Sequence, residues 1–156
     1  MKQNNSGMTI IVKTIAKLVI YFISVFAFYI TLTGHLTPGG GFAGGAIFAA
    51  GLTLLLLAFG KDILLKKFNY SKLNIADSLG ALAFVIIGFC GFFFASAFLN
   101  NFFFKGKVFH IFSSGQILYL NIAIFVKVAA CLFSILLLLS MFRILSENKT
   151  SKEKEK

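Results

Sequence analysis

The feature that most constrains this chain is a set of long stretches without a charged residue. The first covers the 43 residues between Lys17 and Lys61, and two later stretches contain 27 and 19 residues. A soluble domain would need another layer of protein to cover each stretch, whereas lipid covers it directly. With 58% hydrophobic residues, only 13% charged residues and a mean hydropathy of +0.91, the 156-residue chain is predicted to be an integral membrane protein.

The first stretch is too long for a single membrane crossing, and Thr37-Pro38-Gly39-Gly40-Gly41 divides it near its middle. The remaining sequence offers two more apolar segments of spanning length. We therefore predict an all-α, polytopic membrane domain over residues 1–145, followed by a polar, disordered cytoplasmic tail over residues 146–156. Its four transmembrane helices are predicted at about 13–33, 42–60, 78–100 and 117–142.

The distribution of basic residues predicts the orientation of these helices. Twelve of the fifteen Lys and Arg residues lie in the N-terminal segment, the connector after the second helix and the C-terminal segment. Two lie in the connector before the fourth helix, and one lies within that helix. Cytoplasmic segments carry the excess of Lys and Arg, so both termini are expected in the cytoplasm. This explains the net charge of +10 without nucleic acid, because no basic stripe with interleaved stacking aromatics occurs.

The segment from Gly34 to Gly45 departs from an ordinary membrane helix, because six of the fourteen glycines fall within it. Gly41, Gly45 and Ala49 follow one another at helical spacing, which favours close approach of another helix. The alternative is that free amides at the start of the second helix bind an anion or line an ion path. The helix-packing and turn residues are Pro38, Gly39, Gly40, Gly41, Gly44 and Gly45.

His35 lies in this segment, at the expected outer mouth between the first two helices. An imidazole there could relay protons near neutral pH, or it could simply bond nearby backbone. Asn121, in the fourth helix, is interpreted chiefly as a residue that hydrogen-bonds between helices.

Lys127 is the second departure, because it falls about 15 Å along the fourth helix, near the bilayer midplane. A lysine stem of about 6 Å is too short to reach either interface. The small or weakly polar residues around it predict that Lys127 faces protein, while Phe125, Leu132, Phe133 and Leu136 point elsewhere; this small face comprises Ala123, Ala130, Cys131 and Ser134.

No carboxylate of the chain is expected to neutralise Lys127. Asp77 stands just before the third predicted helix, where an N-cap is favoured over an ion site, and the other four acidic residues fall at cytoplasmic helix ends or in connectors. The partner of Lys127 is therefore expected on another subunit, unless the amine is neutral. Two roles remain open for it, an ion or proton path and a structural lysine at an interface.

Nothing in the sequence indicates an enzyme, a cofactor or a metal site. The chain has two histidines, no acid–base pair on its predicted helices and no phosphate-binding loop. Cys90 and Cys131 lie inside apolar runs without metal-ligand spacing and are interpreted as packing residues.

The segment Gly34-His35-Leu36-Thr37-Pro38-Gly39-Gly40-Gly41-Phe42-Ala43-Gly44-Gly45 resembles the signature of the MnhB domain, the B subunit of Mrp-type multisubunit Na+/H+ antiporters. The resemblance covers nearly all of the chain before the tail. The stretch from Tyr119 to Ala130 is similar to the fourth helix of a subset that also occurs in energy-converting membrane-bound hydrogenases. Ala43 and Asn121 stand where that family often has glutamine and aspartate, which leaves Lys127 as the better ion-pathway candidate beside His35 and Asn121.

The resemblance implies a subunit of a heteromeric antiporter in the cytoplasmic membrane, with other membrane subunits and lipid as partners and Na+ and H+ as transported ions. One alternative is the same position in the ion-translocating module of a hydrogenase or respiratory complex. Another is a structural or pore-forming homo-oligomer built on the glycine face.

Overall fold

The computed structural model describes residues 8–60, 70–95, 98–99 and 111–154 and contains no strand in these ranges. Its elements are α1 (Ile10–Thr33), α2 (Gly41–Phe59), α4 (Tyr70–Ala95), a short 3₁₀ helix (Ile111–Ser114) and α5 (Gln116–Lys154). All four α-helices are long and apolar enough to cross a membrane. The predicted all-α class with four transmembrane helices is confirmed.

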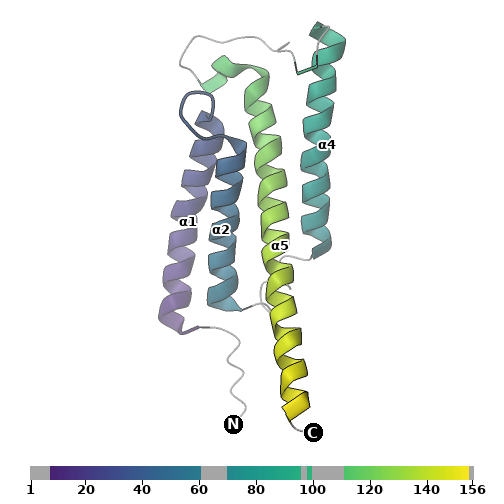
Figure 1. Cartoon of the computed structure of the whole chain (residues 1–156). Helices are drawn as coiled ribbons and strands as arrows, with labels where there is room; N and C mark the ends of the chain where they lie inside the picture. The colour runs from purple at the N-terminus through teal and green to yellow at the C-terminus, as the bar shows by residue number, and fades with distance from the viewer. Residues whose placement is uncertain (1–7, 61–69, 96–97, 100–110, 155–156) are drawn as a thin grey trace.

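The four helices lie side by side in the order α1, α2, α5, α4, with α1 and α4 running opposite to α2 and α5 (Figure 1). α2 packs on α1 and α5, whereas α4 packs mainly on α5. The difference shows in burial, because 39% of the membrane-spanning window of α2 is buried but only 17% of that of α4. α4 is therefore the least covered helix of the molecule.

Three hydroxyl groups in α1 and α2 satisfy their hydrogen bonds locally. The Ser24, Thr31 and Thr53 hydroxyls each donate to the carbonyl four residues earlier, at 2.7–2.8 Å. Such bonds let these polar residues reside in an apolar helix, because their hydroxyls do not face hydrocarbon unpaired.

The turn between α1 and α2 is built on Gly40. The amides of Leu36 and Thr37 donate to the Thr33 carbonyl and close the end of α1, and the Gly44 amide donates to the Gly40 carbonyl to begin α2. Gly40 has φ +119°, a backbone conformation that residues with a Cβ rarely adopt. The turn predicted at residues 37–41 is present, and it requires glycine at this position.

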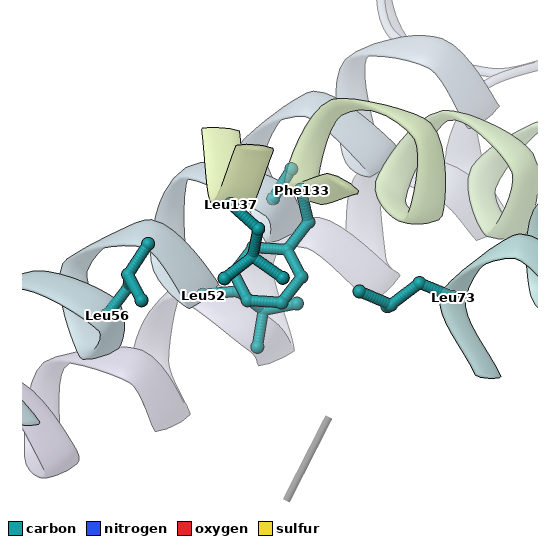
Figure 2. Packing of buried hydrophobic residues seen from close by; sticks show 6 residues of the cluster. Leu52, Leu56, Leu73, Phe133 and Leu137 are labelled. Atoms are coloured by element: carbon teal, nitrogen blue, oxygen red, sulfur yellow. The ribbon is translucent and has the colours of Figure 1, made fainter. Parts of the chain in front are cut away.

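An apolar cluster joins α2, α5 and the first turn of α4. Phe133 and Leu137 of α5 lie at its centre, 0% and 2% exposed, against Leu52 and Leu56 of α2 and Leu73 of α4 (Figure 2). A second contact stacks the rings of Phe28, Phe48 and Phe125, with centroids 5.1–6.0 Å apart. The rings of Phe125 and Phe133 fill the space that the small residues of α2 leave open.

Two helix boundaries differ from those predicted. α4 begins at Tyr70, eight residues before the predicted start, because residues 70–77 contain neither Gly nor Pro and Leu73 is buried against the core. Asp77 therefore lies inside the helix, and its assignment as an N-cap is wrong.

At the other end, α5 continues as one helix to Lys154, where a disordered tail had been expected. The sequence after Arg143 likewise contains no Gly or Pro that would stop a helix. Residues 61–69 of the predicted basic connector and residues 100–110 of the predicted outer loop from Asn100 to Gln116 lie outside the described residues.

Candidate functional site

An ion pair joins α4 and α5. The Lys127 ammonium donates a hydrogen bond to Asp77 Oδ1 at 3.0 Å. The expectation that no carboxylate of this chain could neutralise Lys127 is wrong. It followed from placing Asp77 before the helix, whereas the earlier start of α4 brings its carboxylate alongside α5.

The pair lies at the polar end of the apolar part of α4 and well inside the apolar part of α5. Asp77 is seven residues after the start of α4, about 10 Å along its axis, and Lys127 is eleven residues after the start of α5, about 16 Å along its axis. The helices are antiparallel, so these depths are measured from opposite sides of a hydrocarbon layer about 30 Å thick. A lone charge at this depth costs several kcal/mol, and pairing offsets part of that cost.

Gly80, three residues after Asp77, lets the two helices approach. A Cβ atom at Gly80 would lie 2.8 Å from the Lys127 backbone nitrogen and 3.0 Å from the Ala123 carbonyl oxygen. Any side chain would therefore push α4 away from α5 at the level of the ion pair. Sequence reasoning missed Gly80 and favoured an N-cap over an ion site at Asp77; the signal was a glycine one turn beyond the single carboxylate of α4.

The ion pair is not enclosed by its own chain. The Lys127 side chain is 46% exposed and that of Asp77 is 35% exposed. Of the small residues predicted to share the face of Lys127, the structure buries Ala123, Ala130 and Ser134. The Lys127 stem thus leaves a buried face, while its charged end lies at the border of α4 and α5 beside open surface.

Polar side chains also line a groove on α4 next to Asp77. It encloses about 350 Å³ and is lined by Ser71, Asn74, Ile75, Ser78, Leu79 and Leu82. The described residues form a second groove of similar volume between α4 and α5, beyond Gly80, and its lining is almost entirely apolar. Polar side chains therefore interrupt the surface of α4 beside Asp77, whereas the surface beyond Gly80 is almost entirely apolar.

The glycine segment packs against helices of the same chain. A Cβ atom at Gly41 would overlap the Asn121 carbonyl, one at Gly44 would overlap the Thr31 hydroxyl, and one at Gly45 would lie 2.9 Å from the Phe125 carbonyl oxygen. α1 and α5 thus occupy the face that was expected to receive another helix.

Asn121 and His35 lie at this end of the molecule. The Asn121 amide lies against the turn, 3.0 Å from the position a Cβ would take at Gly34, and His35 is the next residue, half-buried. Pro38 and Gly39 are exposed. The structure thus brings Asn121 to the turn that carries His35, whereas Lys127 lies six residues further along α5 and contacts α4. The three predicted ion-pathway residues occupy two separate places.

Comparison with known proteins shows which family this chain resembles. Residues 11–134 match the family described as a domain related to the MnhB subunit of Na+/H+ antiporters. The chain is 41% identical over 132 residues to an uncharacterized protein of Methanocaldococcus jannaschii, covering 80% of this chain and 49% of that protein. It is 38% identical over 85 residues to a Staphylococcus epidermidis protein named "Putative antiporter subunit mnhB2", covering 53% of this chain and 57% of that protein.

Among solved structures, a chain of the membrane-bound sulfane sulfur reductase, an archaeal respiratory membrane complex, superimposes with a TM-score of 0.70. It is 27% identical, and the match covers 90% of this chain and 63% of that chain. This chain therefore spans about half the length of the two curated relatives described above and nearly two thirds of the structural neighbour.

Proposed function

The chain belongs to the family of domains related to the MnhB subunit of Na+/H+ antiporters, and on this premise we propose that it is a membrane subunit of a multisubunit cation/proton antiporter. The transported ions are Na+ and H+, and the neighbours of this chain are other membrane subunits of the complex and lipid. The chain lies in the cytoplasmic membrane with both termini on the cytoplasmic side, in keeping with its distribution of Lys and Arg.

The observation that carries a role in ion movement is the Asp77–Lys127 pair. A carboxylate and an amine inside a membrane are expensive compared with two apolar side chains of similar volume, so their presence points to function. Both groups exchange protons, and the ammonium occupies on Asp77 the place that a monovalent cation would take. A pair of this kind can pass a proton or release its carboxylate to a cation when the local field changes.

The exposed side of the pair supports a heteromeric complex. In the isolated chain, nearly half of the Lys127 side chain is uncovered, at a depth where lipid would otherwise contact it. α4 also has the smallest buried share of the four spans. Another subunit beside α4 and the pair would close this side and complete any path for ions.

The structural neighbour supports a second candidate, in which the same subunit serves the ion-translocating arm of a hydrogenase or other respiratory membrane complex. The role of Asp77 and Lys127 would be the same there, and only the partners would differ. The homo-oligomeric pore is not proposed, because the glycine face on which it depended is filled by α1 and α5.

The test is purification of the tagged chain from its native membrane in mild detergent, followed by identification of the co-purifying proteins and transport measurement. We expect several other membrane subunits and, in everted vesicles, Na+-dependent proton movement that is lost when this subunit is deleted. Co-purification of redox subunits would select the respiratory complex. A stable homo-oligomer without other subunits would contradict both candidates.

A further inference from the structure

The polar side chains of α4 are confined to its beginning. Six polar residues lie within its first nine residues, and from Leu79 to Ala95 no side chain carries oxygen or nitrogen; the six are Tyr70, Ser71, Lys72, Asn74, Asp77 and Ser78. A helix turns by about 100° per residue, so Lys72 lies on one side of the helix, while Ser71, Asn74, Asp77 and Ser78 fall within about 120° of its circumference on the other. We call these four residues the polar arc.

The polar arc borders the contact with α5 and ends at the ion pair. Leu73 and Gly80 are buried toward α5, and Asp77 forms the edge of the arc nearest to them, where it meets Lys127. Ser71, Asn74 and Ser78 are exposed, and they line the groove described above. One turn beyond Asp77, Ala81 continues the same side of the helix with an apolar residue.

The hydroxyl of Ser78 differs from those of Ser24, Thr31 and Thr53. These three donate to the carbonyl four residues earlier, whereas Ser78 makes no such bond within the described ranges. The Ser134 hydroxyl of α5 also lacks a partner in the described part of the chain, but it is buried, whereas Ser78 is exposed. An exposed hydroxyl or amide facing hydrocarbon costs roughly 2–7 kcal/mol without a partner. The three exposed groups beside the ion pair are stable only where water or polar protein meets them.

We propose that the polar arc is one wall of a water-filled half-path that leads from the beginning of α4 to the Asp77–Lys127 pair and ends there. Serine, asparagine and carboxylate oxygens suit water, hydronium and small monovalent cations. The opposite wall belongs to a neighbouring subunit, since this side of α4 is open in the chain itself. Which ions use the half-path rests on the proposed function, but its hydration does not.

Cysteine accessibility in the assembled complex tests the half-path. The native Cys90 and Cys131 are first replaced by alanine, and single cysteines are then placed at Ser71, Asn74 and Ser78. Ala76→Cys is the control at the same depth, on the opposite side of α4, and Ala81→Cys is the control one turn beyond the pair. The measurement is the rate of modification by a membrane-impermeant methanethiosulfonate in right-side-out and inverted vesicles.

We expect Ser78→Cys to react at least about 10-fold faster than Ala76→Cys and Ala81→Cys, because the reactive thiolate forms only where water solvates it. The reaction should proceed from the side on which α4 begins. Equal rates for Ser78→Cys and Ala76→Cys would show a dry arc covered by a partner helix and would overturn the proposal. Fast modification of Ala81→Cys would show a path that does not end at the pair, which also overturns it.

The same vesicles separate this inference from the proposed function. Each variant is first shown to co-purify with its partner subunits, so that altered assembly is not read as altered hydration. A reactive Ser78→Cys in a complex without cation/proton exchange would leave the half-path intact and contradict the antiporter assignment. An unreactive Ser78→Cys in a complex that exchanges cations for protons would contradict the half-path and leave the antiporter assignment intact.

Discussion

The two helix contacts of α5 use glycine in the same way but surround different chemistry. On one side, Gly41 and Gly45 bring α2 against the backbone of α5, and the neutral amide of Asn121 lies beside Gly34 and Gly40 at the end of that contact. On the other side, Gly80 brings α4 against the backbone of α5 beside a carboxylate and an ammonium. The first contact is apolar and largely buried, whereas the second is charged and partly open.

This difference divides the molecule into a packed unit and an attached helix. α1, α2 and α5 bury one another through small residues and aromatic rings, as a membrane protein does when dispersion is the main attraction. α4 adds Leu73 to the shared apolar cluster and otherwise meets α5 through Gly80, the ion pair and a hydrogen bond from the Gln116 side-chain amide to the Ile87 carbonyl. The packed unit is therefore expected to determine folding, and the α4 contact is expected to determine ion movement.

The strongest test of this division is substitution in the packed unit. Gly41→Leu or Gly45→Leu places a side chain where the α5 backbone lies, which costs more than about 3 kcal/mol since neither helix can move without losing its other contacts. We expect almost no folded chain in the membrane, measured by size-exclusion chromatography of a fluorescent fusion. Phe42→Leu is the matched control, because Phe42 is 68% exposed on the same turn. Normal folding of both glycine variants would contradict the view that close packing of α2 on α5 determines folding.

Lys127→Ala tests the other side of α5. The complex should assemble, but Na+-dependent proton movement in everted vesicles should fall to background, because the carboxylate of Asp77 loses its partner. Lys127→Arg keeps the charge but not the proton exchange and should remain strongly impaired. Lys72→Ala is the control, as it removes an exposed lysine near the start of α4. Full activity of Lys127→Ala would remove the pair from the ion path.

The sequence was sufficient for the fold because the apolar runs and the Pro-Gly turn leave few arrangements in a membrane. It also singled out Lys127, since a lone amine in a helix of apolar residues stands out without any structure. It did not reveal the partner, because the start of a helix without Gly, Pro or a clear cap is poorly marked. An error of eight residues at Tyr70 moved Asp77 from a helix interior to a helix end.

The sequence around a row of glycines likewise does not say which helix packs against it. Gly41 and Gly45 predict close packing equally well for a partner subunit and for α5 of the same chain. The outcome depends on the order of helices in space, which rests on contacts between residues about 80 positions apart. The polar arc was hidden for the same reason as the ion pair, as its first residues had been assigned to a connector.

Gly80→Ala is expected to have an intermediate effect. The added methyl group meets the backbone of Lys127 at 2.8 Å, so α4 must shift by a few tenths of an ångström or more and stretch the ion pair. We expect a loss of about 1–3 kcal/mol in the thermal stability of the complex and reduced antiport, with α1, α2 and α5 still folded. Limited proteolysis would then cut near α4 before other sites. Unchanged stability and transport would show that close approach at Gly80 is not required.

The smallest effect is expected when the charges of the ion pair are removed, and it measures what the pair contributes to stability. Asp77→Asn and Lys127→Met should each lower the unfolding free energy of the complex by about 1 kcal/mol, less than for a fully buried pair because both side chains are partly exposed. The double variant should regain most of that loss, since neither charge is left alone, yet it should not regain transport. Thermal unfolding and vesicle assays on all four proteins complete this double-mutant cycle.

Additive losses of stability would mean that the two charges are stabilised by other subunits and not by each other. Recovered transport in the double variant would mean that the pair holds α4 in place and takes no part in moving ions.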